Sequence, residues 1–484
     1  MISTVPQVHH LIGGEAVPGR HTFEVKDPGR PADVVAVVAE GDAEHVDRAV
    51  VAAGAASGVW AGMALGDRLK LLTDGLAAVE SIADELAATL VHENGALLRE
   101  AQMDVNRAVA LSRSMFAIAE DHLADHVLDG PADVITVLKQ PVGIVGMVVP
   151  WNSPMVLAAS KVAPALAAGN TVILKPSPEA PVALTRAMAT LAAFLPPGVL
   201  NVVNSAGGAG PTLSAHPDVR KMSFTGSTQV GRAVMSAAAG NLKRVSLELG
   251  GNDAAVILDD VDLEASVDAL ASGVFTRAGQ ICFAIKRIYV ARSRHDELVD
   301  ALCARVDRYV VGHGMSEGVD FGPLINARQA ERVIDLVDRA LVGGAKVHEL
   351  GRLSDEAAES GGHYLRPVVV TGVDQSAELV STEQFGPAIP VIPFGNVDEA
   401  VTLANDSEFG LASSVWSSDP EKAFAVAARL QAGSTFVNSH NVWSLSFDMP
   451  FGGVKQSGIG RERTALGFDE YIEHHAIRVP KHTT

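Results

Sequence analysis

The chain has 484 residues, of which 48% are hydrophobic and 45 are glycine. This composition is that of a folded protein, and the length favours two or three domains over a single core. The formal net charge of -19, from 57 acidic against 38 basic residues, should repel nucleic acid and anionic lipid. We therefore expect neither nucleic acid nor a membrane as a partner.

Targeting signals and paired metal-binding motifs are not evident in the sequence. Residues 1–7 lack a basic segment followed by an apolar one, and no apolar run is long enough to cross a bilayer, so we expect a cytoplasmic protein. The two cysteines, Cys282 and Cys303, are too few for a disulfide framework. Neither they nor the histidines have the spacing of metal ligands, and no metal is predicted.

Hydrophobic periodicity divides the chain into helical and strand-like stretches. Residues 42–126 are mostly amphipathic helix, as the spacing of Leu69, Leu72 and Leu76 illustrates, and we expect these helices to cover a sheet. Short apolar β-type runs then alternate with helical stretches, at 143–149, 171–174, 200–203, 221–225 and 245–249. This alternation predicts right-handed crossovers and a parallel sheet.

A second series of strands follows the first, at 254–258, 287–290, 367–370, 389–394, 413–416 and 434–437. Two further β-type runs, 134–138 and 471–479, would each leave an open edge, so we expect them to pair with each other or across subunits. The predicted fold is α/β, with two parallel-sheet, Rossmann-like domains and a small β arm for oligomerisation. A homodimer or a homotetramer is expected.

The predicted domain boundaries follow from these series. They give a dinucleotide-binding domain at 1–118 and 142–247, a catalytic domain at 248–450, and an oligomerisation arm at 119–141 and 463–484.

Cys282 is the candidate nucleophile. A reactive thiol needs a lowered pKa or a nearby base, backbone donors for the oxyanion it creates, and little steric cover. Glycines precede it at Gly279 and flank the acid at Glu248, which ends a predicted parallel strand, where α/β sites gather. The alternative is a buried, inert cysteine. Cys303 fits that alternative, because apolar residues surround it at helical spacing.

Seven motifs occur in a characteristic order: Pro150-Trp151-Asn152, Lys175-Pro176-Ser177, Phe224-Thr225-Gly226-Ser227-Thr228, Glu248-Leu249-Gly250-Gly251, Gly279-Gln280-Ile281-Cys282, Glu383-Gln384-Phe385-Gly386-Pro387, and Pro450-Phe451-Gly452-Gly453 followed by Ser457-Gly458-Ile459-Gly460-Arg461-Glu462. With these motifs the chain resembles the aldehyde dehydrogenase superfamily along nearly its whole length. Each motif alone is weak evidence, whereas their joint order is strong evidence.

The resemblance implies oxidation of an aldehyde to a carboxylic acid with NAD(P)+. Cys282 would add to the aldehyde, and the resulting oxyanion would be held by the Asn152 side chain and the Cys282 backbone N–H. Glu248 would activate the water that hydrolyses the thioester, which requires burial to raise its pKa. Glu462 resembles the family's auxiliary carboxylate, with a surface pair to Arg461 as the alternative.

The same resemblance implies how the cofactor binds. Lys175 and Glu383 would hydrogen-bond the two riboses, and Phe385 would pack at the nicotinamide end. Ser227 opens a predicted helix whose N-terminus favours a phosphate, with Gly226 and Gly231 keeping that approach open. The remaining residues expected at the cofactor are Trp151, Ser177, Glu179 and Leu249.

Two departures from the family pattern affect these expectations. Pro178 stands where many NAD-preferring relatives have glutamate, and the acid follows at Glu179, so NAD is favoured with NADP as the alternative. Thr276-Arg277-Ala278 replaces the more usual Asn-rich approach to the thiol, which leaves the mobility of that loop open.

Two other functions remain as alternatives. A CoA-acylating relative would resolve the thioester with CoA, although Glu248 would then be superfluous. A retired enzyme could serve as a binding or structural protein. The aldehyde itself is indicated by the segment 439–448, which contains Trp443, Leu445 and Phe447, and by Phe283. These residues favour a medium or bulky apolar or aromatic aldehyde over a small charged one.

Overall fold

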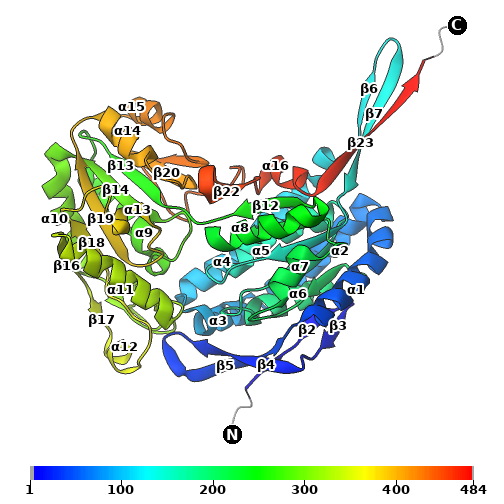
Figure 1. Cartoon of the computed structure of the whole chain (residues 1–484), viewed down its shortest axis with the longest axis horizontal. Coiled ribbons are helices and arrows are strands. Elements are labelled where there is room, and N and C mark those ends of the chain that lie inside the picture. Colours follow the sequence, from blue (N-terminus) through cyan, green and yellow to red (C-terminus); the bar gives the residue numbers. More distant parts are fainter. Residues whose placement is uncertain (1–4, 482–484) are drawn as a thin grey trace.

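The computed structural model describes residues 5–481. Residues 1–4 of the predicted cofactor-binding domain and 482–484 of the predicted arm lie outside the described residues. Two large sheets with helices around them lie next to each other, and a third, small sheet projects from one of them (Figure 1). The predicted α/β fold with two mainly parallel sheets is therefore confirmed. No helix within residues 5–481 is long and apolar enough to cross a membrane.

The first large sheet has eight strands in the order β22-β12-β11-β8-β9-β10-β2-β3. Its parallel centre consists of the five predicted strands, β8 (Ile144–Val148), β9 (Thr171–Lys175), β10 (Leu200–Val202), β11 (Lys221–Thr225) and β12 (Arg244–Glu248). Antiparallel strands that were not predicted extend both edges, β2 (His10–Ile12), β3 (Glu15–Val17) and β22 (Gly458–Ile459).

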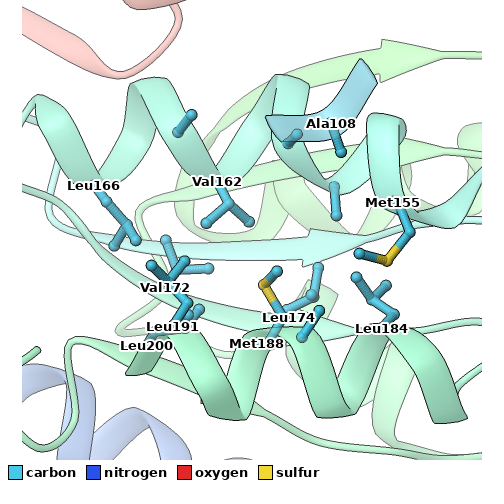
Figure 2. Close-up of a cluster of buried hydrophobic side chains, with 14 of the residues drawn as sticks. Ala108, Met155, Val162, Leu166, Val172, Leu174, Leu184, Met188, Leu191 and Leu200 are labelled. Atoms are coloured by element: carbon cyan, nitrogen blue, oxygen red, sulfur yellow. The ribbon is translucent and has the colours of Figure 1, made fainter. Parts of the chain in front are cut away.

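Helices cover both faces of this sheet. The crossover helices α5 (Pro154–Ala167) and α6 (Val182–Ala192) pack on one face, and α7 (Ala209–Ala215) and α8 (Thr228–Ala238) pack on the other. Apolar side chains of α5 and α6, among them Val162 and Met188, converge with Leu174 of β9 in one buried cluster (Figure 2).

The upstream helices α1 (Ala43–Gly62), α2 (Leu65–Ser81), α3 (Ala83–Asn94) and α4 (Leu98–Leu123) occur as predicted. Only α1 packs on the sheet itself, whereas α2, α3 and α4 pack mainly on α5 and α6. The expected cover of the sheet is thus only partly right, because α5 and α6 already occupy one face.

The second large sheet has seven strands in the order β16-β18-β19-β14-β13-β20-β21. All pairs are parallel except that of β16 with β18. The six predicted strands are β13 (Asp253–Ile257), β14 (Ile285–Ala291), β18 (Val368–Thr371), β19 (Ala388–Phe394), β20 (Ala412–Trp416) and β21 (Ser434–Val437), and β16 (Lys346–Glu349) was not predicted. Its larger helices are α9 (Leu263–Phe275), α10 (His295–Val306), α11 (Ala327–Val342), α14 (Val397–Asn405) and α15 (Pro420–Ala427). Cys303, on α10, packs partly buried against the core of this sheet.

The projecting arm is a three-stranded antiparallel sheet of β6 (His126–Asp129), β7 (Asp133–Pro141) and β23 (Ile472–Pro480) (Figure 1). The predicted pairing of the runs near 134–138 and 471–479 is confirmed within one chain. The short helix α16 (Thr464–Asp469) precedes β23 and packs on α4 and α5. Smaller strands lie near the N-terminus, at β1 (Gln7–Val8), β4 (His21–Asp27) and β5 (Arg30–Glu40), and near the second sheet, at β15 (Val310–Val311) and β17 (Arg352–Leu353).

A buried carboxylate, Asp27, connects the N-terminal strands with both large units. Ring nitrogens of His92 on α3 and of His313, just after β15, lie 3.0 and 2.9 Å from the same oxygen, Oδ2. The Gly29 N–H donates to Oδ1 at 2.8 Å. Burial alone would raise the pKa of Asp27, but the hydrogen bonds from His313 and His92 hold it well below its usual range.

The Asp27 cluster has ligand atoms close enough together to hold a metal ion. However, the Met315 N–H donates to Nδ1 of His313 at 3.2 Å, so the proton of a neutral ring is on Nε2 and faces Asp27. A metal bound at Nε2 would leave the ring proton on Nδ1, where it would face the Met315 N–H, another donor. The arrangement therefore favours a hydrogen-bonded cluster over a metal site.

We predict that Asp27→Ala lowers the free energy of unfolding by about 2–3 kcal/mol at pH 7, because it leaves a buried donor of His313 without an acceptor. A carboxyl whose pKa is depressed in the folded state stabilises above its unfolded pKa of about 3.9, and the contribution declines as the pH falls below that value. The difference from wild type should accordingly shrink between pH 5 and about 3. Urea unfolding followed by fluorescence measures both.

The control is Asp33→Ala, on the exposed side of β5. Equal stability of the two variants at pH 7 would contradict the role assigned to Asp27.

Candidate active site

Cys282 lies on a loop between α9 and β14, which follows a 3-10 turn formed by Thr276–Gly279. Arg277 and Ala278 in this turn both have a φ of 54°, a left-handed conformation that is uncommon for residues other than glycine. The Arg277 N–H donates to Glu100 on α4 at 3.1 Å, and its guanidinium donates to the Ser153 hydroxyl at 3.1 Å. Hydrogen bonds to two other segments therefore anchor the approach to the thiol.

Lys286 holds the other side of this loop, and the sequence interpretation missed it. Its ammonium group donates to the carbonyls of Ile281 at 2.6 Å and Cys282 at 3.3 Å, and its side chain is only 2% exposed. Glu383 lies 3.9 Å from the same nitrogen. The available signal was two adjacent cationic residues, Lys286 and Arg287, inside an otherwise mainly apolar strand, where a buried charge requires a partner.

The thiol of Cys282 is protonated at neutral pH in this structure. Burial raises the pKa of Cys282 to about 12, and the nearby Lys286 charge only partly opposes this. A thiol can be activated by a lowered pKa or by a nearby base, and the pKa of Cys282 is not lowered. A base must take the proton when the sulfur attacks.

Two cavities meet at Cys282. The first, which we call the arginine-lined cavity, is bounded by Glu100, Met103, Asp104, Arg107, Asn152, Ser153, Val156, Leu157, Thr276, Arg277, Ile281, Cys282, Phe283, Val442, Leu445, Phe451 and Arg463. The second, the motif cavity, is bounded by Pro150, Trp151, Asn152, Leu157, Thr225, Gly226, Ser227, Leu249, Gly250, Cys282, Gln329, Arg332, Glu383 and Phe385. Cys282 and Asn152 line both cavities, as their predicted roles require.

Two donors beside the sulfur are suited to an oxyanion. One hydrogen of the Asn152 amide donates to the Gln280 carbonyl at 3.0 Å, which fixes the side chain and leaves the second hydrogen free. The Cys282 backbone N–H donates to no other group within the described part of the chain. Such preorganised donors stabilise negative charge that develops next to them.

Glu248 ends β12, as predicted, and is buried without lining either cavity. Neither carboxylate oxygen has a hydrogen-bond partner among the described residues. Burial raises the pKa of Glu248 well above its usual value, and the nearby Glu462 charge adds to the shift. A Cβ at Gly452 would lie 2.8 Å from Glu248 Oε1, so only glycine leaves room for this carboxylate.

Glu462 is buried and forms an ion pair with Lys161 of α5. It also accepts from the Ser160 hydroxyl at 2.6 Å. The alternative of a surface pair with Arg461 is wrong, because Arg461 donates to the carbonyls of Gly453 and Gly460 instead. Glu462 lines neither cavity.

The motif cavity brings together six of the residues expected at the cofactor, namely Trp151, Gly226, Ser227, Leu249, Glu383 and Phe385. Trp151 and Phe385 meet edge to face with ring centroids 5.7 Å apart. Glu383 accepts from the Gly251 N–H at 3.2 Å, and desolvation raises its pKa. Thr225 Oγ1, at the end of β11, is buried without a partner among the described residues.

Helix α8 begins at this cavity. Ser227 is its N-cap and accepts from the Val230 N–H at 3.3 Å, as the predicted helix start requires. A Cβ at Gly231 would lie 2.5 Å from the Leu249 side chain, so this glycine permits close packing of α8 on Leu249; it does not line the motif cavity, and its expected role at the phosphate stays a prediction.

The other three predicted cofactor residues, Lys175, Ser177 and Glu179, lie at the carboxyl end of β9, outside the motif cavity. The Ser177 hydroxyl donates to Glu179 at 2.8 Å. Burial lowers the pKa of Lys175 to about 8, and the charges of Glu179 and Glu40 oppose the shift. The sequence interpretation missed Glu40, which ends β5 and accepts from the Ser205 hydroxyl at 2.6 Å.

Nearly the whole chain is similar to known proteins in both sequence and fold. The Aldehyde dehydrogenase family model matches residues 16–477. The chain is 38% identical to the 3-succinoylsemialdehyde-pyridine dehydrogenase of a Pseudomonas species, over 95% of each protein. It is 36% identical to a probable succinate-semialdehyde dehydrogenase [NADP(+)] of Sinorhizobium fredii, over 96% of this chain and 93% of that protein. The crystal structure of betaine aldehyde dehydrogenase from Staphylococcus aureus in complex with NAD+ matches with a TM-score of 0.93 at 32% identity, covering 97% and 94% of the two chains.

We predict that alkylation of Cys282 by iodoacetamide, in enzyme without ligands, accelerates about tenfold per pH unit from pH 7 to 9.5 without a plateau, because only the thiolate reacts and the pKa is about 12. Peptide mass spectrometry at timed intervals measures the rate at this residue. Cys282→Ser gives the background from Cys303. A plateau below pH 9 would mean that the thiol ionises in its ordinary range.

Proposed function

Because the chain belongs to the aldehyde dehydrogenase family, we propose that it works through a thioester on Cys282. The family membership makes it an NAD- or NADP-dependent enzyme that oxidises aldehydes to carboxylic acids. The observation that carries the proposal is that Cys282 and Asn152 line both cavities. One sulfur can then meet an aldehyde from one side and a dinucleotide from the other.

The first step is addition of the Cys282 sulfur to the aldehyde carbon. The S–C bond forms as the thiol proton passes to the Glu248 carboxylate, which releases it to solvent before hydrolysis. The carbonyl oxygen becomes an oxyanion between the Asn152 amide and the Cys282 N–H. Lys286 supports this step by fixing the carbonyls of the loop that presents the sulfur. The NAD(P)+ nicotinamide, when bound, supplies the acceptor for the hydride that leaves the thiohemiacetal.

Hydrolysis of the thioester is assigned to Glu248. Its two oxygens have no hydrogen-bond partner among residues 5–481, and burial raises its pKa, which makes the carboxylate a stronger base towards water. The side chain has to turn towards the thiol from its present position beside Gly452. Water then attacks the acyl carbon, the C–S bond breaks, and the carboxylic acid leaves.

The cofactor fits the motif cavity and the region beyond it. The α8 N-terminus at Ser227 favours a phosphate, and the unpartnered Thr225 hydroxyl lies beside it. Glu383 would accept from the ribose at the nicotinamide end, with Trp151 and Phe385 around it. At the other end, Lys175, Ser177 and Glu179 would hold the adenosine ribose.

NAD is proposed as the preferred cofactor. Glu179 and Glu40 both carry negative charge close enough to affect Lys175. Two carboxylates at this place would repel a 2′-phosphate.

The body of the substrate is proposed to be apolar and of medium size. The arginine-lined cavity, where we place the substrate, is lined by Phe283, Leu445 and Phe451. The sequence analysis favoured an apolar aldehyde on the basis of the same kind of residues. Trp443, by contrast, is 66% exposed and lines neither cavity. The relatives act on aldehydes that their names describe as semialdehydes or betaine aldehyde, so the names alone leave the substrate open.

Two rival functions are less well supported. A CoA-acylating enzyme would not need a buried base such as Glu248. A retired enzyme kept as a binding protein would not need to keep the thiol, the amide donor and the buried base.

A homo-oligomer is also proposed, because the arm has two open strand edges and exposed apolar side chains, Val127 and Leu128 on β6 and Ile477 and Val479 on β23. An isolated monomer would leave these edges to solvent.

The function is tested by NADH formation from benzaldehyde with purified enzyme. In Cys282→Ala the rate of NADH formation should fall by more than about a thousandfold, because the nucleophile is removed. The variant should still bind NAD, as measured by fluorescence titration. The matched control, Cys303→Ala, should keep wild-type activity. Turnover should not need CoA, and kcat/KM should be higher with NAD than with NADP. A strict requirement for CoA, or activity in Cys282→Ala, would overturn the proposal.

The oligomer is tested by sedimentation velocity. Wild type should sediment as a dimer or larger, and Leu128→Asp together with Ile477→Asp should shift the population towards monomer, because a charge replaces apolar contact area. A wild-type monomer at micromolar concentration would contradict the proposal.

A further inference from the structure

Three arginine side chains line the arginine-lined cavity beside Cys282, namely Arg107, Arg277 and Arg463. None of them forms an ion pair with a carboxylate within 4 Å in the described part of the chain. Charged residues are seldom buried unless they are paired. A cavity with several unpaired guanidinium groups therefore requires an explanation.

The two acids of the same cavity are already engaged by backbone donors. Glu100 accepts from the N–H groups of Leu97 and Arg277. Asp104 accepts from two N–H groups at the start of α5, at 3.2 Å each. Arg277 is the charge that most offsets the burial of Asp104, so this arginine has a partner at longer range. Arg107 and Arg463 have none in the cavity wall: the carboxylate that most offsets the burial of Arg463, Glu462, lies outside the wall and is already paired with Lys161.

Arg463 is the more deeply buried of the two, with 6% of its surface exposed. Its Nε has no hydrogen-bond partner among the described residues, and its one contact to a carbonyl, that of Ser446, is long at 3.4 Å. Its guanidinium lies 5.4 Å from the Phe451 ring centroid. Burial, and then the Arg107 charge, lower the pKa of Arg463 to about 10, so the group is still charged at neutral pH.

Arg107 reaches the same cavity from α4. Its guanidinium donates to the Leu445 carbonyl at 2.6 Å and lies 4.9 Å from the Phe447 ring centroid, and these contacts fix its direction. Within the described part of the chain, its remaining N–H groups donate to no other residue. Two like charges are thus held at one cavity, although each would be more stable in water.

We propose that the aldehyde substrate carries a carboxylate remote from its aldehyde carbon, and that Arg463 and Arg107 bind this carboxylate in the arginine-lined cavity. The fork of N–H donors on a guanidinium matches the two oxygens of a carboxylate. The apolar walls around Phe283 and Leu445 bind the body between the two ends. The substrate class is therefore an oxo acid with an apolar body, which keeps the apolar body favoured by the sequence but adds a charged end that the sequence did not predict. This inference rests on the proposed function.

The test compares acids with their own methyl esters. Wild-type enzyme is assayed with NAD on 4-oxobutanoate, 5-oxopentanoate, 6-oxohexanoate and 4-carboxybenzaldehyde, each against its ester. For at least one pair, kcat/KM should favour the acid by at least about tenfold, chiefly through KM, because a buried charge-assisted hydrogen bond is lost in the ester.

The variants Arg463→Met and Arg107→Met should each reduce this acid-to-ester ratio by about tenfold or more. Arg113→Met is the matched control, because Arg113 lies on the same helix, is exposed and pairs with Glu80. Its ratio should equal that of wild type.

Wild-type enzyme that shows no preference for any of the acids, or variants that leave the ratio unchanged, would overturn the inference. Since the wild-type comparison needs no variant, a variant that fails to fold does not affect that result. If neither acids nor esters produced NADH, the proposed function itself would fail.

Discussion

The sulfur of Cys282 has to face two cavities at once, and the elements around it meet that requirement. The loop that carries it is held by Lys286 on one side and by Glu100 and Ser153 on the other. Asn152, from the first large unit, donates to the Gln280 carbonyl in the same loop. Contacts from both large units thus determine where the thiol lies. Small displacements of this loop would change the alignment of the sulfur with both cavities. Such misalignment would slow the reaction, because the reacting atoms must be held close together in the right orientation.

Buried charge accompanies this arrangement. The thiol and Glu248 both have raised pKa values because they are removed from water, so each holds its proton more tightly than in solution. Lys161 and Lys286, by contrast, are neutralised locally by Glu462 and Glu383. Arg107 and Arg463 of the arginine-lined cavity have no such carboxylate in the cavity wall. This is why we propose that their charge is neutralised by a carboxylate of the substrate. Several of the buried side-chain atoms without a hydrogen-bond partner in residues 5–481 belong to the candidate site or its surroundings, namely those of Thr225, Glu248, Arg277 and Arg463.

The sequence predicted the centres of both sheets because their strands are buried on two faces and therefore read as continuous apolar runs. It missed β2, β16 and β22, which are short or lie at sheet edges, where no such run is needed. The motifs named most of the residues that line the motif cavity. Their neighbours Lys286 and Arg463 were missed, because the burial of a charged side chain depends on contacts with distant segments.

The central claim, that a thioester forms on Cys282, is tested most directly by mass spectrometry of Glu248→Gln. This variant keeps the thiol but lacks the base, so the acyl enzyme should accumulate after mixing with NAD and aldehyde. Acid quenching and digestion should give a Cys282 peptide heavier by the aldehyde less the hydride and proton removed in oxidation, and only when NAD is present. An unmodified Cys282 peptide after NADH has formed, or the acyl group on Cys303, would contradict the account.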